Sequence, residues 1–136
     1  MDAIINIEVR NNKNRRHRMT LSLDADLANE GHILKFFSHL QLYEPEVCHV
    51  LSLALEHGDT FIDVGANAGF FTAMAGLLVG DTGNIIAFEP GSNTIDRLKA
   101  NIDLNNLDNV TLITNPVSDK IETVNFYLND NNSGGY

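Results

Sequence analysis

The chain has 136 residues, of which 43% are hydrophobic and 20% are charged, and its formal net charge is −9 at pH 7. This length fits one globular domain, and no apolar run approaches the ~20 residues that a membrane-spanning helix needs. An acidic chain lacks the cationic face that nucleic acids require, and the single cysteine, Cys48, has no partner for an internal disulfide. The sequence starts without a signal-peptide pattern. We therefore expect a cytoplasmic protein that binds neither nucleic acid nor membranes.

The first part of the chain predicts a β-hairpin followed by two helices. β-Forming residues gather on both sides of a polar, arginine-rich turn, which is typical of a hairpin. Apolar residues then recur at helical spacing, and Pro45 suits the first turn of the second helix while Gly58 suits its end. We treat residues 1–57 as this lead-in and residues 58–136 as a second, α/β unit. The predicted elements are strands at 4–9 and 19–23 and helices at 27–39 and 44–56.

From residue 58 onward, strands and helices alternate. The predicted strands are short, continuous apolar runs, and the predicted helices present an apolar face. This order is typical of a parallel sheet, so we predict an α/β, Rossmann-like fold with helices on both faces of the sheet. The predicted elements are strands at 60–64, 84–88 and 110–114, a candidate fourth strand at 124–128, and helices at 70–79 and 93–104.

The most informative stretch is FIDVGANAG at residues 61–69, where an apolar strand runs into a glycine-containing turn and then a helix. In open parallel sheets, ligands bind at such turns, at the carboxyl ends of the strands. Gly65 would let the backbone approach a ligand closely, and Gly69 would allow close helix packing. The alternative is a tight turn that binds nothing, but it gives no role to the acidic residues nearby.

Two classes of ligand need different residues at this turn. A dinucleotide site needs Gly-x-Gly-x-x-Gly, whereas Asn67 and Phe70 stand at the second and third glycine positions, and Asp63 would repel a pyrophosphate. S-Adenosylmethionine has no phosphate. Its ammonium group would be attracted by Asp63, and backbone N–H groups of the loop would bind its carboxylate. The loop therefore favours S-adenosylmethionine, and an NAD-dependent oxidoreductase remains as a less favoured alternative.

A second acid, Glu89, ends the strand predicted at 84–88. A carboxylate at this position can accept hydrogen bonds from both ribose hydroxyls of an adenosine moiety. A lone glutamate at a strand end is usually a surface residue, but its spacing behind a glycine loop predicts a ligand contact. The five histidines show no metal-ligand spacing, so we predict no metal site.

Four motifs resemble the FkbM family of methyltransferases: FIDVGANAG, IAFEP (86–90), LKANIDLN followed by NV (98–110), and VSD (117–119). The resemblance covers about residues 40–128. It implies a class I methyltransferase fold, S-adenosylmethionine as the methyl donor, and O-methylation. The implied acceptor is a carbohydrate or other small molecule, often methylated at a sugar or polyketide-type hydroxyl.

The same resemblance implies a role for each matching position. The glycine loop would line the methionine end of the cofactor, Glu89 would hold the ribose, Val117 and Ser118 would lie near the adenine, and Tyr43 with Glu44 would close over the cofactor. The candidate cofactor-binding residues are Tyr43, Glu44, Asp63, Gly65, Ala66, Asn67, Gly69, Phe70, Glu89, Pro90, Val117 and Ser118.

The family pattern has seven strands, and this sequence predicts only three parallel strands and one candidate fourth. We therefore expect a truncated sheet whose first strand, 60–64, has an open edge unless 124–128 or the hairpin pairs with it. Two functions stay open. The first is an enzyme that transfers a methyl group to an acceptor oxygen, with a catalytic base that the sequence does not identify. The second is a non-catalytic module that binds the cofactor and pairs with another chain. An open edge also predicts a homodimer, or association with a missing half.

Overall fold

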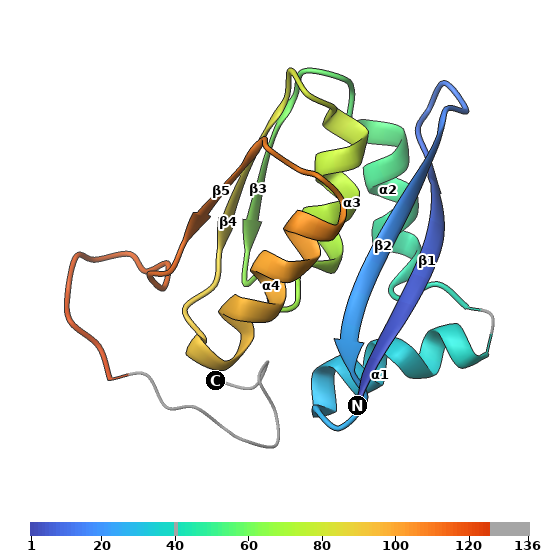
Figure 1. The fold of residues 1–136 in the computed structure, drawn as a ribbon. Coiled ribbons are helices and arrows are strands. Elements are labelled where there is room, and N and C mark those ends of the chain that lie inside the picture. Colours follow the sequence, from blue (N-terminus) through green and yellow to red (C-terminus); the bar gives the residue numbers. More distant parts are fainter. Residues whose placement is uncertain (40, 126–136) are drawn as a thin grey trace.

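Figure 1 shows the fold in a computed structural model, which describes residues 1–39 and 41–125. A two-stranded sheet and two helices precede a unit in which strands and helices alternate. None of the helices in the described residues is long and apolar enough to span a membrane. The elements, in chain order, are β1 (Asp2–Arg10), β2 (Arg16–Asp24), α1 (Ala28–Ser38), α2 (Pro45–Ala54), β3 (Thr60–Val64), α3 (Phe70–Val79), β4 (Asn84–Phe88), α4 (Ser92–Leu104) and β5 (Val110–Ile113).

The predicted hairpin and both lead-in helices are confirmed. The strands β1 and β2 pair in antiparallel register from Asp2 opposite Asp24 to Arg10 opposite Arg16. The side-chain oxygen of Asn11 closes the turn, because it accepts hydrogen bonds from the backbone N–H groups two and four residues later, at 3.0 and 2.9 Å. The polar turn residues therefore fix where the hairpin reverses.

The helix α2 ends earlier than the sequence predicts. It begins at Pro45, one residue after the predicted start, and ends at Ala54 rather than near residue 56. Gly58 has a left-handed φ of 97°, and its N–H group donates to the carbonyl oxygen of Val79 at 2.8 Å. Gly58 thus forms the turn between α2 and β3 and contacts the end of α3, instead of closing α2.

The three strands β3, β4 and β5 form a parallel sheet in that order. Each new strand is added on the same side of the previous one, so right-handed crossovers put α3 and α4 on the same face of the sheet, as Figure 1 shows. Ile85 and Ala87 of β4 are buried beneath these helices, while Ile62 and Val64 of β3 are 57% and 62% exposed. Within the described residues, the prediction of helices on both faces therefore holds for one face only.

No described residue pairs with the outer edge of β3. The hairpin forms a separate sheet, so it does not substitute for a fourth strand. Residues 121–125 form no strand, and the rest of the predicted strand at 124–128 lies outside the described residues.

The hairpin covers the side of α3 and α4 that faces away from the parallel sheet (Figure 1). Met19, Leu21 and Leu23 of β2 are fully buried and belong to the same hydrophobic cluster as Leu78 of α3 and Ile85 of β4. The molecule is therefore layered as sheet, helices and hairpin, and the lead-in contributes to the same core as the α/β unit.

Candidate functional site

The turn between β3 and α3 is held against the end of β4. The backbone N–H groups of Gly65 and Ala66 both donate to the carbonyl oxygen of Phe88, at 2.9 Å each. Gly65 has a φ of 83°, and a methyl group added there would meet nothing within 4 Å, so this side of the loop is open. Gly69 has a φ of 89°, and an added methyl group would lie 2.6 Å from Leu98 of α4. Gly69 therefore permits close helix packing, as predicted.

Glu89 fixes the glycine loop from the end of β4. The residue is 1% exposed, and its two carboxylate oxygens accept hydrogen bonds from the backbone N–H groups of Asn67 and Gly91, both at 2.7 Å. A methyl group on Gly91 would lie 2.8 Å from the Glu89 carboxylate, so this close approach depends on glycine. An ionised carboxylate has about four lone-pair sites, which leaves acceptor capacity on Glu89 for further donors.

Asp63 lies on β3 and faces α3. It is 9% exposed, and its carboxylate accepts a hydrogen bond of 2.5 Å from the hydroxyl of Thr72. Burial raises the pKa of Asp63, the Thr72 hydrogen bond opposes this effect, and the nearby charge of Glu89 adds to it. Neither acid forms an ion pair with any described residue. Two carboxylates without a cation make this edge of the sheet electronegative, which suits a cationic ligand.

Asn67 carries an unsatisfied polar atom at the same place. Its φ is 50°, and its side-chain oxygen Oδ1 is buried with no hydrogen-bond partner among the described residues. A buried acceptor without a donor is costly unless a ligand or water supplies one. The ammonium group of S-adenosylmethionine is a donor of the required kind, so this atom and the open side of Gly65 fit that cofactor.

The loop offers fewer backbone donors than the sequence suggested. The N–H groups of Gly65, Ala66, Asn67 and Gly69 all donate to acceptors within the protein. The first N–H groups of α3 have no partner within the helix and lie at the positive end of its dipole. One of them, the N–H group of Thr72, donates to the Asp63 carboxylate, so a carboxylate ligand would depend on the N–H groups of Phe70 and Phe71, where the helix begins.

Tyr43 and Glu44 lie beside the start of α3. The Tyr43 ring packs edge-on against Phe70, with centroids 5.3 Å apart, and lies 6.0 Å from the ring of Phe71. Burial, assisted by a hydrogen bond to Glu44, raises the pKa of Tyr43 to about 12. Glu44 is exposed and precedes α2 with a left-handed φ of 42°. That this pair closes over a cofactor stays a prediction.

Val117 and Ser118 do not join the loop and the acids in this structure. Val117 is 54% exposed, and the hydrogen bonds of the Ser118 hydroxyl are to the neighbouring Asp119 and Lys120. Figure 1 shows this segment running away from the sheet after β5. Pro90, by contrast, is half-buried directly after Glu89.

Sequence reasoning missed three residues that support the site, namely Thr72, Gly91 and Asn101. Each had a signal in the sequence. Thr72 is a polar residue in an otherwise apolar helix, Gly91 directly follows the Glu89-Pro90 pair, and Asn101 lies on the apolar face predicted for α4. A buried polar residue needs a partner, so such positions can be singled out before the partner is known.

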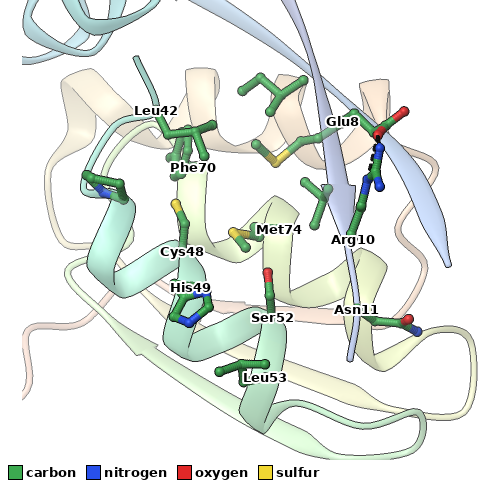
Figure 2. Close-up of a pocket in the computed structure, with 14 residues that line it drawn as sticks. Glu8, Arg10, Asn11, Leu42, Cys48, His49, Ser52, Leu53, Phe70 and Met74 are labelled. Carbon is green, nitrogen blue, oxygen red and sulfur yellow. Dashed lines mark hydrogen bonds and ion pairs between the residues drawn. The ribbon is translucent and has the colours of Figure 1, made fainter. Parts of the chain in front are cut away.

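An apolar cavity of about 430 Å³ lies elsewhere, between α2 and β1 (Figure 2). Its lining includes Cys48 of α2 together with Phe70 and Met74 of α3. Neither Asp63 nor Glu89 lines it. The cavity and the electronegative site are therefore separate, and they share only the residue that begins α3.

Comparison with known proteins identifies the family. The family model "Protein-L-isoaspartate(D-aspartate) O-methyltransferase (PCMT)" matches residues 41–119, which is more than half of the chain. The chain belongs to this family. The match includes β3, the glycine loop and Glu89. It confirms the methyltransferase class that the motifs predicted, but not the FkbM family specifically.

The curated relatives are methyltransferases of another name. A "Probable cobalt-precorrin-6B C(15)-methyltransferase (decarboxylating)" from Sulfurisphaera tokodaii is 33% identical over 82 residues, which are 58% of this chain and 43% of the relative. A protein of the same name from Sulfolobus acidocaldarius is 30% identical over 93 residues, which are 66% of this chain and 48% of the relative. The chain thus spans about half the length of the curated relatives it matches.

Solved structures agree on the fold. An S-adenosylmethionine-dependent O-methyltransferase from Thermotoga maritima has a TM-score of 0.51 and 16% identity, and the match covers 81% of this chain and 55% of that one. An S-adenosylmethionine-dependent methyltransferase from Aquifex aeolicus has 27% identity and a TM-score of 0.49, covering 62% of this chain and 46% of that one. The Thermotoga maritima structure confirms the Rossmann-like α/β fold that the sequence predicted.

Proposed function

We propose that this chain binds S-adenosylmethionine at the carboxyl ends of β3 and β4 and forms the cofactor-binding half of a methyltransferase. The observation that carries the proposal is the buried, unpartnered Oδ1 of Asn67 beside two carboxylates that no described cation neutralises. Together with the family match, this arrangement favours a ligand that brings an ammonium donor and hydroxyl donors. When bound, S-adenosylmethionine supplies the methyl group for transfer.

Each residue has a distinct task in this proposal. Asp63 and the Oδ1 atom of Asn67 accept hydrogen bonds from the ammonium group, the first N–H groups of α3 bind the carboxylate, and the free lone pairs of Glu89 accept the ribose hydroxyls. Gly65 leaves room for the ligand to pass over the loop. These residues bind and orient the donor, and the acceptor site with its base lies beyond them.

The finer proposal is O-methylation of a hydroxyl group on a sugar or other natural product by an enzyme of the FkbM type. Its support is the resemblance of residues 61–69 and 86–90 to that family. The relatives carry other names: the curated ones name a decarboxylating C(15)-methyltransferase, and the family model names a protein-L-isoaspartate(D-aspartate) O-methyltransferase. The choice of a sugar or natural-product hydroxyl as the acceptor therefore rests on the motifs alone.

Isothermal titration calorimetry of this chain with S-adenosylhomocysteine and, separately, with NAD tests the ligand. We expect heat of binding for the first and none for the second, and the opposite result would overturn the proposal. Asp63→Asn should weaken binding, because the amide is a poorer partner for an ammonium group. Asp81→Asn is the matched control, since Asp81 is exposed in the turn before β4, at the opposite edge of the sheet from the site, and should not affect affinity.

The second candidate is a non-catalytic module that pairs with another chain or with a second copy of itself. The specific observation is the unpaired edge of β3, where Ile62 and Val64 are more than half exposed and no lysine or proline protects the strand. Light scattering coupled to size exclusion should report a mass above that of the monomer, and Ile62→Lys should reduce it. A monomer at tens of micromolar would contradict this candidate.

A further inference from the structure

The helix α4 presents a row of polar side chains to the outer edge of β2. The Asn105 side chain accepts the backbone N–H group of Thr20 at 2.8 Å and donates to its carbonyl oxygen at 2.7 Å. One turn earlier, Asn101 accepts the N–H group of Ser22 at 2.7 Å and donates to its carbonyl oxygen at 3.1 Å. Two asparagines therefore satisfy the strand edge that β1 leaves unpaired.

Asn101 makes one contact that Asn105 does not. Its Nδ2 group also donates to the carbonyl oxygen of Ala68 at 2.7 Å. Ala68 lies in the glycine loop and is 1% exposed, and Asn101 itself is fully buried. One side-chain amide thus bonds the hairpin and the cofactor loop at the same time, with all its hydrogen-bonding groups in use.

We propose that Asn101 is a positioning residue that couples the N-terminal hairpin to the cofactor loop. The proposal rests on the proposed function only for the identity of the ligand. Ala68 follows Asn67, whose N–H group binds Glu89 and whose Oδ1 is the unpartnered acceptor of the site. Asn101 therefore fixes the loop at the residue next to the ligand-facing acceptor, and the hairpin contributes to cofactor binding without touching the cofactor.

The pair Asn101→Ala and Asn105→Ala tests this coupling, because each variant loses two bonds to β2 and one further bond. For Asn101 the further bond goes to Ala68 in the loop, whereas for Asn105 it goes to the backbone carbonyl oxygen of Asn101, at 2.7 Å. Thermal unfolding should show that both are less stable than the parent chain. Calorimetric affinity for S-adenosylhomocysteine, measured where all three proteins are folded, should fall on the order of tenfold for Asn101→Ala and stay within about twofold of the parent for Asn105→Ala. Equal losses of affinity would overturn the proposal, because they would report general destabilisation.

Hydrogen exchange in the unmodified chain gives a second test that does not depend on a variant folding. The amide of Ser22 is bonded to Asn101, and the amide of Thr20 is bonded to Asn105. S-Adenosylhomocysteine should slow exchange at Ser22 several-fold more than at Thr20. Binding without this difference overturns the coupling alone, whereas failure of the parent chain to bind overturns the proposed function and, with it, the coupling.

Discussion

Glu89→Gln is the change that most directly probes the site, because it preserves the shape of the side chain and removes its charge. In the folded chain both carboxylate oxygens accept backbone N–H groups, from Asn67 and Gly91. Glutamine has one oxygen and one NH₂ group, so it can accept only one of the two. The other N–H group would face a donor in a position where Glu89 is 1% exposed.

The expected cost follows from these two bonds. A hydrogen bond to a charged group contributes about 1.5–3 kcal/mol, so Glu89→Gln should lower the free energy of unfolding by about that amount. Glu89→Ala leaves both N–H groups unpaired and should cost about 2–6 kcal/mol, a large part of the 5–15 kcal/mol that typically stabilises a domain. Each variant should also bind S-adenosylhomocysteine more weakly, because acceptors for the ribose hydroxyls are lost.

Urea unfolding followed by circular dichroism measures the stability term, and a shift in midpoint with an unchanged slope would identify a true loss of stability. The matched control is Glu122→Gln, because Glu122 is exposed and a surface change of this kind stays within about 0.5 kcal/mol. If Glu89→Gln proves as stable as the control, Glu89 does not hold the loop and the geometry of the site is wrong.

Three further predictions concern the loop and the buried thiol. Thr72→Val removes a side-chain hydrogen bond that lowers the pKa of Asp63 and so opposes the effect of burial, and the pKa of Asp63 should therefore rise further. An unchanged midpoint in a carboxyl NMR titration would contradict this prediction. Gly65→Ala and Gly69→Ala should each lower the free energy of unfolding, measured in urea, by about 1–2 kcal/mol, because both glycines have a left-handed φ. The loss should be larger for Gly69→Ala, since only its methyl group would collide with α4. Equal losses would argue against close packing at Gly69. Burial raises the pKa of the Cys48 thiol from 9.0 to about 11, so the unfolded chain ionises first and the free energy of unfolding should fall as the pH rises through this interval. Tyr43 adds to the fall above pH 10, so Cys48→Ala should reduce the slope most between pH 9 and 10, and an unchanged slope there would contradict the prediction.

The sequence alone determined the elements around the glycine loop. The predicted bounds of β3, α3 and β4 agree residue for residue with the structure, and α4 and β5 differ by one residue at one end. Their signals are local: continuous apolar strands, apolar residues at helical spacing, and glycines or acids where the chain must turn. The methyltransferase class also followed from the sequence, because its motifs resemble a methyltransferase family and because Asn67, Phe70 and Asp63 disfavour a dinucleotide.

Tertiary structure decided which polar groups meet. Ser22 and Asn101 are 79 residues apart, and Asp63 and Thr72 lie on different elements, so no local period indicates that they are partners. The same holds for the covered face of the sheet, which depends on the direction in which strands are added and not on any single strand. Burial gives these contacts their strength, because a polar group removed from water must find its partner inside the protein. The strand β3 and its loop could be predicted from neighbours in the sequence, whereas the support of the loop by Glu89 and Asn101 exists only once the layers have packed.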